Sequence, residues 1–176
     1  MERYNFIHYD LTLSYLDAGG PGQILIALHA HWMEGQTFAP LALALLPEWR
    51  VIALDQRGHG NSSHAPSYGR EDYLGDLAAL YAHLKITSAV MLGNSLGGVN
   101  AYQFAARHRE SVSGLIIEDI GAIIGDDTSF SLPWSGTFST RQELEETVSA
   151  RFVPYLKDSF RQVADGWRWP STPKTL

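Results

Sequence analysis

The 176-residue sequence contains no cysteine, which excludes a disulfide framework and a thiolate metal site. It has no excess of positive charge: the formal net charge is −6, which argues against a nucleic-acid partner. It also has no run of about 18 apolar residues, so we expect no membrane span, and residues 1–5 show no apolar signal segment. These absences predict a cytoplasmic globular protein, and its length is enough for one domain with a core.

Short apolar runs alternate along the chain with longer segments of helical periodicity. We expect strands within residues 4–16 and at 23–28, 50–54, 88–92 and 112–117, with helices at 37–46, 70–84 and from Ser95 to about 107. Thr37 is a candidate helix cap. This alternation predicts an α/β fold with a mainly parallel sheet flanked by helices.

Residues 93–97 read Gly-Asn-Ser-Leu-Gly and are followed by Gly98. They lie between an apolar strand and a helix, which is the context of a nucleophile elbow. The serine of such an elbow sits on a sharp turn, and small flanking residues let the strand and the helix approach each other. The alternative is a glycine-rich turn in which the serine is incidental.

Polar stretches follow several of the expected strands, at residues 29–32, 55–62, 94–95 and 118–119. Parallel sheets bind ligands beyond the carboxyl ends of their strands, so these stretches predict a small-molecule site at that edge.

The pattern changes after residue 121, because no further buried strand is evident. Residues 140–143 form a capping box that predicts a helix to about Phe152, and Pro154 breaks or restarts it. We therefore divide the chain into a core, residues 1–121, and a helical lid segment with an irregular tail, residues 122–176. From Arg168 onward the sequence does not resemble a packed element.

Three motifs resemble those of the α/β-hydrolase superfamily, in its lid-bearing esterase-like branch. They are residues 28–32 (Leu-His-Ala-His-Trp), residues 55–62 (Asp-Gln-Arg-Gly-His-Gly-Asn-Ser) and the elbow itself. The resemblance covers residues 4–165 and implies the first six strands of that fold, so the chain is similar to a C-terminally truncated member.

The resemblance implies roles for four residues. Ser95 matches the nucleophile, and the backbone N–H groups of Leu96 and His31 match the oxyanion hole. Asp119 matches an acid position used by some members, and the alternative is a loop-capping carboxylate. Ala30 stands where the family has glycine.

Three other residues of these motifs are expected to shape their loops rather than to react. They are His29, Arg57 and His59.

The histidine of a serine triad is missing from its usual place. In this fold the chain order is serine, then acid, then histidine. After Ser95 the sequence has only His108, at the far end of the following helix and ~20 Å away along its axis. The strand that usually precedes the acid is absent as well.

We therefore expect a serine hydrolase of a small carboxylic ester or related acyl substrate, impaired in this chain and needing no metal or other cofactor. The alternatives are a C–C bond hydrolase or perhydrolase of the same fold, and a non-catalytic remnant or small-molecule binding module. Residues 112–117 are apolar on both faces and carry no proline or lysine, so we also expect self-association through this sheet edge.

Overall fold

A computed structural model describes residues 1–119 and 129–169. It contains a six-stranded sheet in the order β1-β2-β4-β3-β5-β6, in which β3, β4, β5 and β6 run parallel. Strand β2 pairs antiparallel with β4, and β1 pairs antiparallel with β2. The strands are β1 (Glu2–His8), β2 (Leu11–Asp17), β3 (Gln23–Leu28), β4 (Trp49–Asp55), β5 (Ala89–Asn94) and β6 (Val112–Glu118). The predicted α/β class and the six predicted strands are confirmed.

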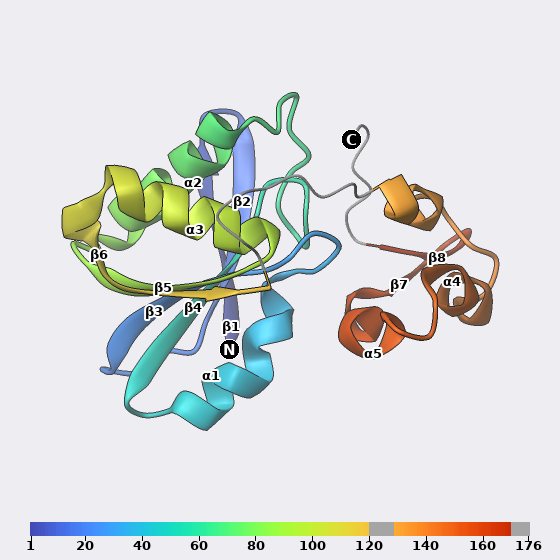
Figure 1. The fold of residues 1–176 in the computed structure, drawn as a ribbon, viewed down its shortest axis with the longest axis horizontal. Helices are drawn as coiled ribbons and strands as arrows, with labels where there is room; N and C mark the ends of the chain where they lie inside the picture. The colour runs from blue at the N-terminus through green and yellow to red at the C-terminus, as the bar shows by residue number, and fades with distance from the viewer. Residues whose placement is uncertain (120–128, 170–176) are drawn as a thin grey trace.

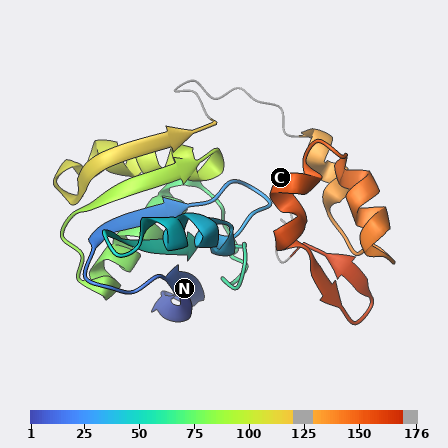
Figure 2. The ribbon, with the colours of Figure 1, turned by 90° about the horizontal axis from the view of Figure 1, so that it is seen from below.

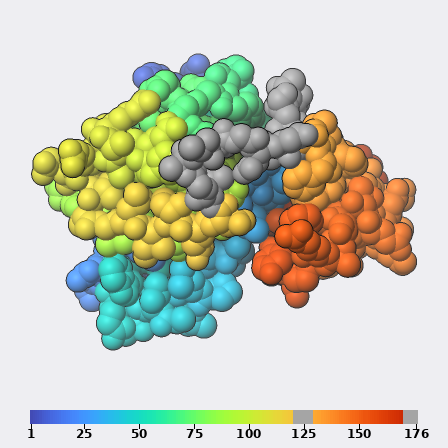
Figure 3. Space-filling model, viewed as in Figure 1, coloured from blue at the N-terminus to red at the C-terminus, as the bar shows by residue number. Residues whose placement is uncertain are grey.

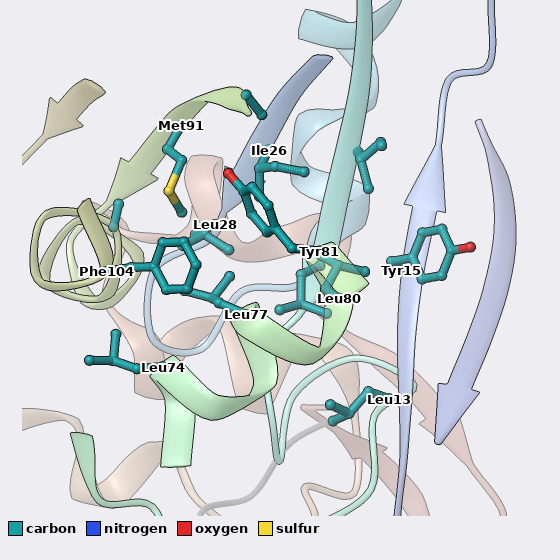
Figure 4. Close-up of a cluster of buried hydrophobic side chains, with 14 of the residues drawn as sticks. Leu13, Tyr15, Ile26, Leu28, Leu74, Leu77, Leu80, Tyr81, Met91 and Phe104 are labelled. Atoms are coloured by element: carbon teal, nitrogen blue, oxygen red, sulfur yellow. The ribbon is translucent and has the colours of Figure 1, made fainter. Parts of the chain in front are cut away.

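Helices cover both faces of the sheet (Figure 1). The two long helices, α2 (Arg70–Leu84) and α3 (Leu96–Arg107), lie on one face, and α1 (Ala39–Leu45) lies on the other. The larger core lies under α2 and α3, where Leu77, Leu80 and Phe104 meet Ile26 and Met91 of the sheet (Figure 4). Strands β3 and β4 are buried on both faces, which explains their continuous apolar runs.

The helix predicted at residues 37–46 begins later than expected. A 3₁₀ turn occupies Gly35–Phe38, and α1 starts at Ala39 with Pro40 in its first turn. Thr37 is therefore not the cap. Pro40 suits the start of the helix because its fixed φ is helical and it has no N–H to leave unpaired.

The segment after the core folds into a small separate layer beside the carboxyl ends of the strands (Figures 1 and 2). We call residues 129–169 the lid. Its elements are η3 (Ser129–Trp134), α4 (Arg141–Val148), α5 (Val153–Leu156), η4 (Lys157–Ser159), β7 (Arg161–Val163) and β8 (Gly166–Arg168). The predicted domain boundary, between residues 121 and 122, lies outside the described residues.

The predicted cap of α4 is present, but the helix is shorter than expected. The Glu143 N–H donates to Thr140 Oγ1 at 3.1 Å. The helix ends at Val148 because Ser149 adopts a left-handed backbone, with φ of 74°. Pro154 then opens α5, so it restarts the helix rather than only breaking it.

The lid also contains a hairpin, β7 with β8, that the sequence did not predict. The expectation that the chain stops packing at Arg168 is wrong for residues 168 and 169, because Arg168 ends β8 and Trp169 is fully buried. The rest of that prediction, residues 170–176, lies outside the described residues. The Trp169 ring lies 5.4 Å from that of Trp32 and 4.8 Å from that of Phe160, measured between centroids. Three-residue strands are too short to produce a periodic pattern, which is why the hairpin was missed.

No helix within residues 1–119 or 129–169 has both the length and the apolar character that a membrane span requires.

The outer edge of β6 is unpaired among the described residues, since this strand pairs only with β5. Leu115 and Ile116 are 41% and 48% exposed, and the surface of β6 is visible between those of α3 and α1 (Figure 3). We propose that two copies of the chain associate through this edge, because unpaired strand groups beside apolar side chains favour pairing with another chain.

Sedimentation at micromolar concentration tests this association. We expect species larger than a monomer, and we expect Ile116→Lys to favour the monomer because a lysine discourages edge pairing. Leu43→Lys is the matched control, because Leu43 is an exposed leucine on α1, a helix that packs on β4. A wild-type monomer whose amides at residues 112–117 exchange freely with solvent would contradict the prediction.

Candidate active site

Ser95 occupies a strained turn between β5 and α3. Its φ and ψ are 48° and −112°, a backbone conformation that non-glycine residues rarely adopt. Its N–H donates to the carbonyl oxygen of Glu118 at 2.9 Å, and its own carbonyl accepts from Val99 N–H at 3.0 Å. The turn is therefore held by the neighbouring strand on one side and by the helix on the other.

The two outer glycines of the elbow are required by close backbone contacts. A Cβ at Gly93 would lie 2.4 Å from the carbonyl oxygen of Gly97, and one at Gly97 would lie 2.1 Å from the carbonyl oxygen of Leu28. Both distances are far inside van der Waals contact. The glycine spacing read from the sequence thus reflects the close packing of α3 against β3 and β5.

A cavity of about 750 Å³ opens between the strand ends and the lid. It brings Ser95, His31 and Asp119 together, as the sequence predicted, and Leu96 begins α3 directly after Ser95. Its lining consists of Ala30, His31, Trp32, Met33, Asn94, Ser95, Glu118, Asp119, Phe130, Ser131, Trp134, Arg151, Phe152, Tyr155 and Leu156.

Residues 55–62, which were expected at the same edge, do not line the cavity but support the loops that do. Asp55 is fully buried and accepts hydrogen bonds from the backbone N–H groups of Gly35 (2.7 Å) and Asn61 (3.0 Å). Arg57 is held by both carboxylate oxygens of Asp76, at 2.7 and 2.8 Å. These contacts agree with the expected structural role of this loop.

His29 is fully buried and joins the loop after β3 to the loop after β4. Its Nε2 accepts a hydrogen bond from the Gln56 N–H at 3.0 Å, and its Nδ1 lies 2.7 Å from the carbonyl oxygen of Ala30. Burial holds the pKa of His29 well below its ordinary value. Both ring nitrogens are occupied, so His29 has the expected structural role.

His31 and His59 are in direct contact, and the sequence did not predict this. His31 Nδ1 lies 3.3 Å from His59 Nε2, while His59 Nδ1 lies 2.9 Å from the carbonyl oxygen of Arg57. Burial lowers the pKa of His31 to about 4 and also lowers that of His59. Both rings are therefore neutral near pH 7.

No histidine in the described part of the chain forms an ion pair with Asp119; His8 with Asp76, at 3.9 Å, is the one histidine–carboxylate pair there. His108, the only histidine after Ser95, stacks on Phe104 with 4.3 Å between the ring centroids and lies outside the cavity lining. The cavity lining thus contains Ser95, the carboxylates of Glu118 and Asp119, and one imidazole, that of His31.

The lid contributes an aromatic wall that sequence reasoning missed. Phe130, Trp134, Phe152 and Tyr155 line the cavity, and Trp134 lies 6.0 Å from Trp32 between ring centroids. The sequence does contain many aromatic residues between positions 130 and 155. Their frequency alone could not show that they line a cavity, because that depends on how the lid packs on the core.

An ion pair also ties the lid to the core, between the buried carboxylate of Glu34 and the Arg161 guanidinium of β7. Burial raises the pKa of Glu34, and the neighbouring Arg161 opposes that rise.

No group of three or more histidine or acidic side chains in residues 1–119 and 129–169 is arranged to hold a metal ion.

Comparison with known proteins agrees with this geometry. The model of the alpha/beta hydrolase fold family matches residues 19–164, which is most of the chain. The chain belongs to the alpha/beta hydrolase family.

Several members of the alpha/beta hydrolase family are similar to it in sequence. A 2-(acetamidomethylene)succinate hydrolase of Mesorhizobium japonicum is 33% identical over 166 residues, which cover 91% of this chain and 59% of that protein. An sn-1-specific diacylglycerol lipase of Mus musculus is 32% identical over 117 residues, covering 64% and 38% respectively. The chain thus spans little more than half of the first of these relatives and less than half of the second.

Solved structures of alpha/beta hydrolases share the fold. A marine microorganism esterase superposes with a TM-score of 0.76 at 26% identity, over 91% of this chain and 68% of that one. An E-2-(acetamidomethylene)succinate hydrolase superposes with a TM-score of 0.82 over 97% of this chain and 69% of that one, at 24% identity.

Proposed function

We propose that this chain is a serine hydrolase, impaired by the lack of a catalytic histidine, that acts on a small carboxylic ester or a related acyl substrate through nucleophilic attack by Ser95. The main support for the proposal is the strained elbow at Ser95, a residue that lines the cavity. Alpha/beta hydrolases expose their nucleophile on such a turn.

In this mechanism Ser95 Oγ attacks the carbonyl carbon of the substrate, and the carbonyl oxygen becomes a tetrahedral oxyanion. The backbone N–H groups of Leu96 and His31 donate to that oxyanion, assisted by the N-terminus of α3. The hydroxyl proton passes to a base and then to the leaving alcohol. Water releases the acyl group in a second, equivalent step. Asp119 is the acid that would orient the base.

The named activities of the relatives support this substrate class. One is named as a hydrolase of an acetamidomethylene succinate, and another as a lipase of diacylglycerol. The aromatic lining from the lid suits an acyl chain or a flat apolar group in the same cavity.

Covalent labelling tests the role of Ser95 directly. The purified chain should react slowly with a fluorophosphonate at millimolar concentration and gain one phosphonyl group in its intact mass, because the oxyanion hole still favours attack by Ser95 in the absence of a histidine base. Ser95→Ala should remove this labelling. Ser131→Ala, which changes a second serine of the cavity lining, is the matched control and should retain it.

Labelling that persists in Ser95→Ala would contradict the nucleophile assignment. An absence of labelling in the folded wild-type chain, after hours at a millimolar concentration of the reagent, would also contradict the nucleophile assignment.

A small-molecule binding module is the second candidate. The lack of a histidine beside Asp119 in the described residues favours it. No histidine pairs with Asp119 among the described residues, so the cavity would bind an acyl compound and leave it unreacted. A chain that binds esters but never labels at Ser95 would support this candidate.

A further inference from the structure

We propose that Arg151 of the lid selects acyl substrates that carry a carboxylate, such as the half-ester of a dicarboxylic acid. The proposal rests on the proposed function, because it concerns the specificity of the same cavity. It adds a negative charge, recognised at the lid, to the ester group that would react at Ser95.

Arg151 lies where a ligand can reach it. It belongs to the turn between α4 and α5, its side chain is exposed, and it is one of the residues that line the cavity. Its guanidinium carbon lies 5.5 Å from the centre of the Phe152 ring, and Phe152 lines the cavity as well. The positive charge therefore lies at the cavity wall and in contact with solvent.

The Arg151 guanidinium is not neutralised by the protein. Within residues 1–119 and 129–169 it forms no ion pair with a carboxylate, whereas Arg161, elsewhere in the lid, is paired with Glu34. A guanidinium keeps its charge at any ordinary pH, and its parallel N–H donors match the two oxygens of a carboxylate. A carboxylate on a ligand could thus bind Arg151 without displacing a carboxylate of the described chain.

The other charged residues of the lining orient such a ligand. Glu118 and Asp119 lie at the end of β6, where the Glu118 carbonyl oxygen accepts from the Ser95 N–H at 2.9 Å. Carboxylates at this end of the cavity repel an anion, and Arg151 in the lid attracts it. The ligand would therefore place its carboxylate toward the lid and its uncharged ester toward Ser95.

Binding of two matched esters tests the proposal. The probes are monomethyl glutarate, a carboxylate at pH 7, and methyl glutaramate, in which a neutral amide of similar shape replaces that carboxylate. The Ser95→Ala chain prevents hydrolysis of either ester. We expect monomethyl glutarate to bind about two- to fivefold more tightly at low ionic strength, the range for a solvent-exposed ion pair.

Added salt should reduce this preference, because salt screens the attraction between exposed charges. Equal binding of the two esters at low ionic strength would overturn the proposal.

NMR of the arginine side chains tests where the carboxylate binds. In the ¹⁵N-labelled Ser95→Ala chain, monomethyl glutarate should shift the Nε–H signal of Arg151 more than methyl glutaramate does. The signal of Arg168 should stay in place, because Arg168 is an exposed arginine of the lid that does not line the cavity. An Arg151 signal that monomethyl glutarate leaves unchanged at saturation would overturn the proposal.

Substitutions separate the charge of Arg151 from its bulk. In the Ser95→Ala background, Arg151→Gln should equalise the two affinities, whereas Arg151→Lys keeps the charge and should retain part of the preference. Arg168→Gln is the matched control and should retain all of it. Changes at exposed positions have little effect on stability, so the melting temperatures should stay close to that of the parent chain. A carboxylate preference that survives Arg151→Gln would overturn the proposal.

Labelling of Ser95 distinguishes this proposal from the serine mechanism. Fluorophosphonate labelling at Ser95 in a chain without a carboxylate preference would contradict the role of Arg151 and support the nucleophile. A preference that depends on Arg151, in a chain whose Ser95 never labels, would support Arg151 and contradict the nucleophile.

Discussion

The purified 176-residue chain is expected to turn over a p-nitrophenyl ester only slowly. Enzymes that lose a member of the triad retain on the order of 10³–10⁴-fold catalysis over water, from the oxyanion hole and binding alone. His108 stacks on Phe104 outside the cavity, so no histidine that follows Ser95 can take the hydroxyl proton. Steady-state hydrolysis compared with Ser95→Ala measures the effect.

Brisk turnover that disappears in Ser95→Ala would contradict this expectation and would identify a base among the residues present. His31 would be the first to test, because it lines the cavity with Ser95 and its Nε2 is unpartnered. His31→Gln would then abolish turnover, whereas His108→Phe would leave it unchanged.

Replacing Gly97 by alanine should destabilise the protein strongly. The new Cβ would lie 2.1 Å from the carbonyl oxygen of Leu28, and a backbone atom of a central strand cannot move aside as a flexible side chain can. We expect a loss of about 3 kcal/mol in the free energy of unfolding, at the upper end for overpacking. The melting temperature should fall by about 6–12 °C.

Gly75→Ala is the matched control, because Gly75 also lies in a helix, α2, but its Cβ would meet only His8 Nε2 at 3.6 Å. Alanine favours helix there by up to about 1 kcal/mol, so the melting temperature should stay or rise. Thermal unfolding of both variants tests the argument. A Gly97→Ala protein as stable as the wild type would show that the elbow tolerates a larger separation of α3 from β3.

The sequence predicted the core well because its signals are local. Buried strands such as β3 and β4 appear as continuous apolar runs, and the elbow combines a strand, a glycine spacing and a helix within a few residues. Asp119 and His31 could be placed at the cavity because both follow the carboxyl ends of parallel strands.

The features that were missed depend on contacts between distant residues. The contact of His31 with His59 joins two loops, and nothing in either loop alone predicts it. The β7–β8 hairpin pairs strands of three residues, and Trp169 is buried by rings that come from Trp32, Trp134 and Phe160. Such packing is set by tertiary structure and has no periodic pattern in the sequence.

The burial of Trp169 gives the molecule an intrinsic optical probe. Three of its five tryptophans meet in one cluster, with ring centroids of Trp32, Trp134 and Trp169 separated by 5.4–6.2 Å. Trp32 belongs to the loop after β3, and the other two belong to the lid. Indole rings this close couple their electronic transitions, so the near-ultraviolet circular dichroism of the chain reports the distance between the lid and the sheet without any added label.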